Sequence, residues 1–153
     1  MHTLENIHIH TACQADIAEL IDIWDEATLS SHNFISETVW LAHKESLLAY
    51  YIAEADIFLA TKGDEIIGFI ALINLEVPAL FVAPKYQNLG IGSRLLLYVK
   101  FICIHLWLRV YKKNKNAIHF YQNHGFLIID SCIDPLTGEE QFVMDWKNRP
   151  LMN

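Results

Sequence analysis

Two glycines stand where an apolar run gives way to a helical pattern, within the segment Gln87-Asn88-Leu89-Gly90-Ile91-Gly92. The run before them, Leu80 to Val82, predicts a short strand, and from Ile91 onward apolar residues recur at helical spacing. The first N–H groups of a helix lack internal partners and lie at the positive end of its dipole. Because glycine has no side chain, an anion can approach the backbone closely there. The segment can therefore bind a phosphate group.

Several phosphate-binding motifs share this outline, and the residues after the glycines distinguish them. A Walker loop requires lysine and then serine or threonine after its last glycine, whereas Ser93-Arg94 follows Gly92 here. A dinucleotide fingerprint requires a third glycine where this chain has Leu95. The pattern that remains is Gln-x-x-Gly-x-Gly followed by an apolar helix. An ordinary glycine-rich turn is the alternative.

A second pattern lies further along the chain, from Asn114 to Phe126, and reads Asn-Lys-Asn-Ala-Ile-His-Phe-Tyr-Gln-Asn-His-Gly-Phe. It fills every fixed position of Asn-x-x-Ala-x-x-Phe-Tyr-x-x-x-Gly-Phe. The two patterns together resemble the two signatures of the GNAT superfamily of N-acetyltransferases, in which the first binds the pyrophosphate of coenzyme A. The resemblance implies an α/β (α+β) fold, with a mixed, mostly antiparallel central sheet of about seven strands flanked by about four helices.

The resemblance also implies acetyl-CoA as the co-substrate and gives each motif a role. Backbone N–H groups of the glycine loop would hold the pyrophosphate, and the side chain of Gln87 or Arg94 could add contacts. The backbone of Leu80 to Val82 would pair with the pantetheine amides like an added strand. Asn114 is a helix N-cap, a ligand to the pantetheine arm, or both. The positions implied to contact the coenzyme are Leu80, Phe81, Val82, Gln87, Asn88, Leu89, Gly90, Ile91, Gly92, Ser93, Asn114, Ala117, Phe120 and Tyr121.

Acetyl transfer from a thioester to an amine requires a neutral amine, a donor to the tetrahedral oxyanion and a proton for the leaving thiolate. The resemblance implies that Tyr121 lies near the coenzyme sulfur and acts as the general acid. A phenol stays protonated at neutral pH, so it can donate that proton. The alternative is a tyrosine on an amphipathic helix, with its ring in the core and its hydroxyl outside.

Two residues are candidates for the base that takes the amine proton. Glu76 lies at the start of the strand that would carry the coenzyme, on the same face as Leu80 and Val82 by strand alternation. His32 lies between two predicted helices, where the resemblance implies the acceptor pocket. A water chain is the alternative to both, and a histidine that caps a helix end is the alternative for His32. The residues predicted to bind the acceptor are His32, Phe34 and Trp40.

Composition and charge narrow the function classes. The chain has 153 residues and is expected to form one domain over 1–153, and no apolar run reaches the length of a membrane span. No signal-peptide pattern is recognised at its start, so a cytoplasmic location is expected. The net charge of −7 argues against nucleic-acid binding and favours attraction of a cationic amine.

Two other groups of potentially reactive side chains are expected to have no chemical role. His8 and His10 share one face of a predicted strand without a paired carboxylate or cysteine, which favours a solvated face over a metal site. Cys13, Cys103 and Cys132 form no CxxC pair and are expected to be reduced core thiols. No metal is therefore expected.

Periodicity predicts the elements that position these motifs. Leu29 to Ile35 lacks a clear period and is expected to be a loop, after which Ser36 caps a second helix. Gly68 suggests a bulge inside its strand. The apolar stretch Phe101 to Trp107 is interpreted as a helix and a strand buried on both sides. The sequence departs from the family pattern at Tyr111, where many small members carry asparagine, and at Pro78, which removes a backbone N–H.

The leading hypothesis is an N-acetyltransferase that transfers the acetyl group of acetyl-CoA to a primary amine by direct attack in a ternary complex. The alternative is a non-catalytic acyl-CoA-binding sensor with the same fold, against which the intact Tyr121 argues. A structural dimer module is a third hypothesis, supported by the apolarity of Phe101 to Trp107. The acceptors that remain open are protein lysines, protein N-termini, polyamines and small antibiotic-like amines, and a monomer or homodimer is expected.

Overall fold

The computed structural model describes residues 6–31 and 36–148. Two short 3₁₀ turns, Gln14–Asp16 and Pro84–Tyr86, accompany the longer elements. In chain order these elements are β1 (Ile7–Thr11), α1 (Ile17–Ser31), α2 (Glu37–Glu54), β2 (Asp56–Lys62), β3 (Glu65–Ile73), β4 (Glu76–Val82), α3 (Ile91–Ile102), β5 (His105–Tyr111), α4 (Lys115–Asn123), β6 (Leu127–Ile133) and β7 (Glu140–Lys147).

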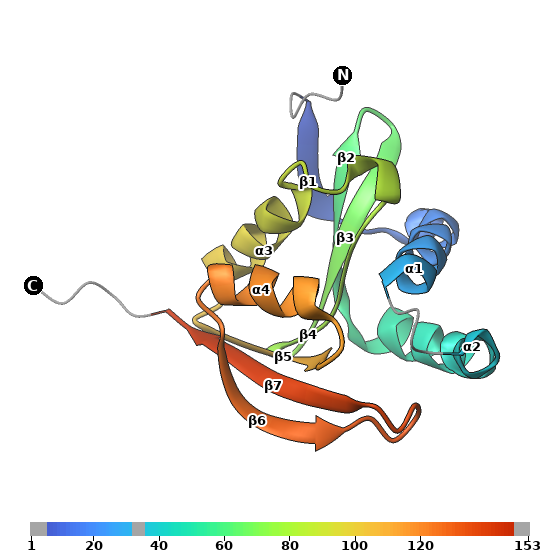
Figure 1. Cartoon of the computed structure of the whole chain (residues 1–153). Helices are drawn as coiled ribbons and strands as arrows, with labels where there is room; N and C mark the ends of the chain where they lie inside the picture. The colour runs from blue at the N-terminus through green and yellow to red at the C-terminus, as the bar shows by residue number, and fades with distance from the viewer. Residues whose placement is uncertain (1–5, 32–35, 149–153) are drawn as a thin grey trace, which may run out of the picture.

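The seven strands form one mixed sheet in the order β1-β2-β3-β4-β5-β7-β6. Neighbouring strands are antiparallel except for β4 and β5, which run parallel. In the part of the chain that the structure describes, β4 and β5 share one register pair, Glu76 with Trp107. The Trp107 N–H also donates to the Leu75 carbonyl at 2.9 Å. Beyond this point the two strands diverge, and Figure 1 shows α4 close to both.

Helices cover both faces of the sheet (Figure 1). On one face α1 buries Leu20, Ile23 and Trp24 against a cluster that includes Phe69 and Ala79. On the other face α3 and α4 pack over a larger cluster, because the helical spacing of their apolar residues turns one stripe toward the sheet. The residues that α3 and α4 bury there are Ile91, Leu95, Leu96, Val99 and Ile118. No helix within residues 6–31 and 36–148 is long and apolar enough to cross a membrane.

The predicted fold class is confirmed, and local signals place several elements correctly. Ser36 caps α2, since its Oγ accepts a hydrogen bond from the Val39 N–H at 3.1 Å. Gly125 follows α4 with φ of 86°, a left-handed conformation that suits glycine. The bulge predicted at Gly68 is present, because Ala60 pairs with Gly68 while the next residue of β2 pairs with Ile66.

Three predictions from the sequence are wrong. The loop predicted from Leu29 begins too early, because α1 continues to Ser31. The stretch from Phe101 to Trp107 is not buried on both sides, because α3 extends past Val99, its last core residue. Cys13 is exposed rather than part of the core, since it precedes α1 at the surface.

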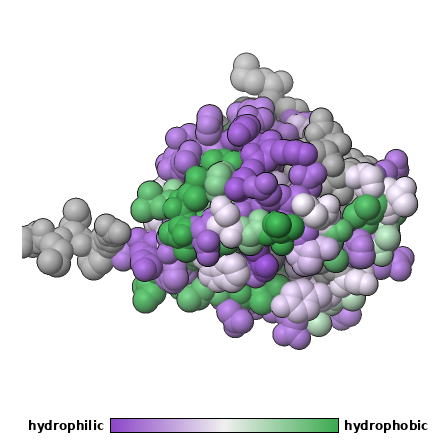
Figure 2. Space-filling view, turned by 60° about the horizontal axis from the view of Figure 1, so that its bottom comes forward, coloured by the Kyte–Doolittle hydropathy of each residue, from purple (hydrophilic) through white to green (hydrophobic). Residues whose placement is uncertain are grey.

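The last two turns of α3 and the segment that follows the helix form an exposed apolar corner. It consists of Leu97, Phe101, Ile102 and Ile104, which are 55, 93, 55 and 77% exposed. Single exposed apolar residues are ordinary, but several within eight positions are not. In Figure 2 the most extensive group of hydrophobic residues on the visible face lies toward the left, and smaller groups lie elsewhere.

Gly68 allows β3 and β4 to approach closely. A Cβ at this position would lie 2.8 Å from the Phe81 carbonyl oxygen, which real Cβ atoms essentially never do. Gly68→Ala should therefore displace β4 and lower the free energy of unfolding by about 1–3 kcal/mol, measured by urea denaturation. Gly92→Ala is the matched control, because its Cβ would meet Phe120 at an ordinary 3.5 Å. Equal midpoints for Gly68→Ala and the unmodified protein would contradict this account.

Candidate active site

A cavity of about 1330 Å³ opens where β4 and β5 part. β4 forms one wall and the glycine loop with α4 another, while residues of α1, α2 and the turn after β6 reach the far side. Leu89 is partly buried against the core and does not line this cavity, and its contact with the coenzyme stays a prediction. The other predicted residues in the described ranges line the cavity together: Glu76, Leu80, Phe81, Val82, Gln87, Asn88, Gly90, Ile91, Gly92, Ser93, Asn114, Ala117, Phe120 and Tyr121.

The three predicted acceptor residues are in or near the segment between α1 and α2. His32 and Phe34 lie outside the described residues, and Trp40 is described only as part of the backbone of α2. Their roles therefore stay predictions. Val39 and His43, one turn apart on α2, do line the cavity. This part of α2 therefore faces the cavity.

The glycine loop presents backbone N–H groups to the cavity. Asn88 and Gly90 both have positive φ, 63° and 84°, which turns the chain sharply into α3. The Arg94 N–H donates to the Gly90 carbonyl at 3.1 Å, as expected for the first intrahelical bond. The N–H groups of residues 91–93 precede that bond, so they have no intrahelical acceptor and lie at the positive end of the helix dipole.

The two side chains expected to assist the loop are engaged elsewhere. The amide nitrogen of Gln87 donates to the Val82 carbonyl at 3.0 Å, which closes the loop onto the end of β4. The guanidinium of Arg94 points back to the Ile7 carbonyl on β1, at 3.4 Å. The prediction that either side chain contacts phosphate is not supported by these contacts. Gln87 fixes the shape of the loop instead.

Tyr86 precedes the loop and links it to the β2–β3 hairpin. Its buried ring lies under the ammonium groups of Lys62 and Lys85, 5.9 and 5.2 Å from the ring centroid. Its hydroxyl hydrogen-bonds Glu65 at the start of β3, which raises the pKa of the tyrosine and lowers the pKa of the carboxyl. The β2–β3 hairpin therefore helps to position the loop.

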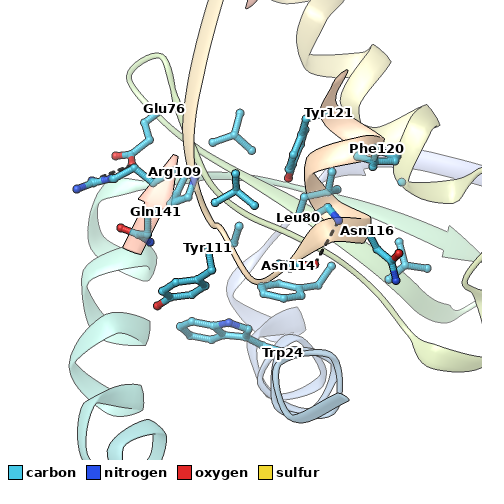
Figure 3. Close-up of a pocket in the computed structure, with 18 of the residues that line it drawn as sticks. Trp24, Glu76, Leu80, Arg109, Tyr111, Asn114, Asn116, Phe120, Tyr121 and Gln141 are labelled. Atoms are coloured by element: carbon cyan, nitrogen blue, oxygen red, sulfur yellow. Dashed lines mark hydrogen bonds and ion pairs between the residues drawn. The ribbon is translucent and has the colours of Figure 1, made fainter. Parts of the chain in front are cut away.

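Helix α4 carries Tyr121 into the cavity. Its N-terminus is capped by Asn114, whose side-chain oxygen accepts from the Ala117 N–H at 3.2 Å. The Tyr121 ring packs against Phe120 and Phe126, with centroids 5.2 and 5.5 Å away, and Figure 3 shows its hydroxyl directed into the cavity. Burial raises the pKa of Tyr121 above the usual range of a phenol. The hydroxyl is therefore protonated at neutral pH.

Glu76 lies across the cavity from Tyr121 and is paired with Arg109 (Figure 3). The Arg109 Nη2 and Nε donate to the same carboxylate oxygen at 2.9 and 3.2 Å. The Arg109 guanidinium also lies over the Trp107 ring, 5.4 Å from its centroid. Because Glu76 is on β4 and Arg109 on β5, this ion pair joins the two strands next to the point where they diverge.

Aromatic side chains line the part of the cavity around Glu76. The Tyr51 ring packs on Trp24 with centroids 5.2 Å apart, and burial, followed by the nearby Glu76 charge, raises the pKa of Tyr51 to about 12. The Tyr111 hydroxyl donates to Asp134 in the turn after β6, and burial and this hydrogen bond raise the pKa of Tyr111. All these groups line the same space as Glu76. This side of the cavity is therefore aromatic, and both of its carboxylates have partners, Glu76 with Arg109 and Asp134 with Tyr111.

The sequence did not identify Arg109, Trp24 and Asp134 as residues of the site. Trp24 has the spacing of a core residue, which it partly is. The Arg109–Glu76 pair joins residues 33 positions apart, and neither position forms a local pattern. Tyr111 was noted as a departure from the family pattern, but its contact with Asp134 depends on the pairing of β5 with β7.

The histidines of β1 lie away from this cavity. His8 and His10 are exposed on the outer strand. Across residues 6–31 and 36–148, no group of three or more His, Cys, Asp or Glu side chains is arranged to hold a metal ion.

Comparison with known proteins agrees with this geometry. Residues 49–127 match the model of the acetyltransferase (GNAT) domain. The chain is 32% identical over 139 residues to peptidyl-lysine N-acetyltransferase YiaC of Escherichia coli strain K12, covering 90% of this chain and 95% of that protein. The chain belongs to the GNAT acetyltransferase family. The predicted family and the predicted acetyltransferase enzyme are thereby confirmed.

Solved structures share the GNAT fold described here. The apo form of YjaB from Escherichia coli superposes with a TM-score of 0.81 at 24% identity, over 94% of this chain and 99% of that one. The PaiA N-acetyltransferase of Thermoplasma acidophilum, in complex with coenzyme A, superposes with a TM-score of 0.77 at 26% identity, over 92% and 98%. The coenzyme expected from the sequence is the one that the PaiA structure contains.

The capping role of Asn114 can be tested without any ligand. Asn114→Ala removes the acceptor for the Ala117 N–H and should lower the free energy of unfolding by about 1 kcal/mol. Asn114→Asp keeps an acceptor at the helix N-terminus and is the matched control. Chemical denaturation of the ligand-free protein is the measurement. If both variants unfold like the unmodified protein, the cap does not stabilise α4.

Proposed function

We propose that this protein transfers the acetyl group of acetyl-CoA to the side-chain amine of a lysine in a peptide or protein. One observation carries the proposal. The Tyr121 hydroxyl lies in a single cavity that has the glycine loop at one end and the Glu76–Arg109 pair with its aromatic neighbours at the other. The names of the peptidyl-lysine N-acetyltransferases YiaC and YjaB support lysine as the acceptor class.

The coenzyme would enter from the side of α3. Its pyrophosphate would accept hydrogen bonds from the N–H groups of residues 91–93, where the helix dipole favours an anion. Its pantetheine arm would lie along Leu80 to Val82, since β4 has no register pair with β5 beyond Glu76 in the described chain. Ala117 and Phe120 would bound the arm on the side of α4. This placement brings the thioester toward Tyr121.

The acceptor would enter from the opposite side. The rings of Trp24, Tyr51 and Tyr111 can contact the methylene chain of a lysine, and the carboxylate of Glu76 can attract its ammonium group. The net charge of −7 attracts a cationic substrate over longer distances. Arg109 keeps Glu76 in place before the acceptor arrives.

The chemistry then needs three proton transfers. The ammonium loses a proton, and the neutral amine attacks the thioester carbonyl, so that a C–N bond forms and a tetrahedral intermediate develops. The C–S bond breaks as the intermediate collapses, and the thiolate takes the Tyr121 hydroxyl proton. The attacking nitrogen gives up its remaining extra proton, which returns to the tyrosinate directly or through water, so that a neutral amide, a thiol and a protonated Tyr121 result. Because burial raises the pKa of Tyr121, the acid form persists to higher pH than for an exposed phenol. Glu76 is proposed to accept the amine proton, directly or through water, with His32 as the second candidate.

The role of Tyr121 predicts a loss of rate without a loss of binding. Tyr121→Phe should lower kcat by at least about 100-fold and leave the Kd of acetyl-CoA within about twofold, because the ring is kept and only the acid is removed. The measurements are thiol release with a peptide that has a blocked N-terminus and a free lysine, and calorimetric titration. Tyr98→Phe is the control, because Tyr98 of α3 packs against Phe58 of β2 and does not line the cavity. An unchanged kcat in Tyr121→Phe would remove this residue as the acid.

The same assay tests the proposed function as a whole. Lysine peptides should release coenzyme A from acetyl-CoA, whereas the same peptides with the lysine already acetylated should not. If acetyl-CoA binds but no lysine peptide, N-terminal peptide, polyamine or aminoglycoside releases thiol, the result favours the non-catalytic sensor. If only N-terminal peptides react, the acceptor class is wrong while the reaction type is right.

Substitutions at Glu76 and His32 separate the two candidate bases. Glu76→Gln keeps an oxygen for Arg109 but removes the negative charge, so kcat/KM for the lysine peptide should fall by about tenfold or more while KM for acetyl-CoA stays constant. His32→Gln should leave both values unchanged. The opposite result would identify His32 as the base. If neither substitution changes kcat/KM, a water chain is favoured.

A further inference from the structure

Ser93 and His124 form a hydrogen-bonded pair beside the coenzyme loop. The Ser93 Oγ lies 2.9 Å from the His124 Nε2. Ser93 is the third residue of α3 and lines the cavity, so its hydroxyl is close to the N–H groups that face the ligand. His124 is the C-cap of α4 and lies three positions after Tyr121, less than one helical turn away. Neither GNAT signature fixes this histidine.

His124 is held in place from three sides. Its ring packs on Phe120 with centroids 4.7 Å apart, and its carbonyl accepts a hydrogen bond from the Lys100 ammonium. Phe120 in turn lies within contact distance of a Cβ placed at Gly92. Burial, followed by the charge of Lys100, lowers the pKa of His124. The imidazole is therefore neutral at pH 7 and has one donor nitrogen and one acceptor nitrogen.

The tautomer of His124 decides what Ser93 can offer an anion. If Nε2 is bare, the Ser93 O–H points to the ring and the serine presents lone pairs to the cavity, which a phosphate oxygen repels. If Nε2 carries the proton, it donates to Oγ and the serine proton is free to point at a phosphate oxygen. Because Gln87 and Arg94 are engaged with main-chain carbonyls, Ser93 is the member of these three whose side chain is placed to serve the anion.

We propose that His124 is a positioning residue for the coenzyme, which donates from Nε2 to Ser93 Oγ and thereby directs the Ser93 hydroxyl proton to the pyrophosphate. This rests on the proposed use of the loop for acetyl-CoA. The pair adds one oriented side-chain donor to the backbone N–H groups of residues 91–93. It acts on the anion and not on the reacting thioester, which gives it a distinct experimental signature.

The test compares acetyl-CoA with acetyl-pantetheine, a donor that has the thioester but no pyrophosphate. Ser93→Ala and His124→Phe should each raise the KM and Kd of acetyl-CoA by about tenfold, the usual effect of one hydrogen bond to a charged group. They should leave kcat for both donors, and KM for acetyl-pantetheine, within about twofold. His124→Phe keeps a ring against Phe120, and His124→Gln, whose amide can still donate to Ser93, should recover most of the affinity.

The double variant shows whether the two residues act together. Ser93→Ala with His124→Phe should be no weaker for acetyl-CoA than either single variant, because each already removes the oriented donor. Additive losses, or equal losses for acetyl-CoA and acetyl-pantetheine, would overturn the proposal and leave His124 a packing residue. If His124→Phe does not fold, Ser93→Ala and His124→Gln carry the same comparison.

A spectroscopic measurement reports the tautomer directly. The ¹⁵N shifts of the His124 ring in the full-length protein should show a protonated Nε2 and a bare Nδ1 when coenzyme A is bound. A bare Nε2 in the complex would overturn the proposal even if the affinities change. Failure of the unmodified protein to bind coenzyme A at all is a different result, since it would end the proposed function and not only the role of His124.

Discussion

The divergence of β4 and β5 is the constraint on which the rest of the structure depends. Two parallel strands that continued to pair would leave no room between them, but these share one register pair in the described chain. β5 pairs with β7 along its whole length, from His105 to Tyr111, so its other edge is fixed independently of β4. Pro78 also removes a backbone donor two residues after the shared pair. The cavity is the space that this divergence leaves.

Each end of the cavity is then built from different physical elements. At the proposed coenzyme end the cavity wall is mostly backbone: the start of α3, shaped by Gly90 and closed by the Gln87 side chain onto Val82. At the proposed acceptor end the groups are side chains from α1, α2, β4, β5 and the turn after β6, held by the Glu76–Arg109 and Tyr111–Asp134 contacts. Tyr121 is placed between the two because α4 packs against the start of α3 through Phe120 and Gly92.

The sequence predicted what local patterns determine. The glycine loop, the cap at Asn114 and the position of Tyr121 each depend on residues within a few positions of one another, and the structure has them where they were expected. The pairing of Glu76 with Arg109 and of Ser93 with His124 depends on strands and helices brought together by the fold, so no local pattern contains them. The prediction that Phe101 to Trp107 is buried on both sides was wrong for a related reason. Apolarity indicates that a segment can be buried, but it does not say where the covering layer ends.

The apolar corner at the end of α3 affects how this protein will behave in concentrated solution. At low ionic strength the net charge of −7 keeps molecules apart, and that repulsion is screened within about 8 Å at physiological salt. Sulfate and similar salts also strengthen the association of exposed apolar groups such as Phe101 and Ile104. Colloidal stability is therefore set by a diffuse repulsion that salt weakens and a local attraction that salt strengthens. The protein is therefore expected to stay dispersed best in buffers of low ionic strength and low sulfate.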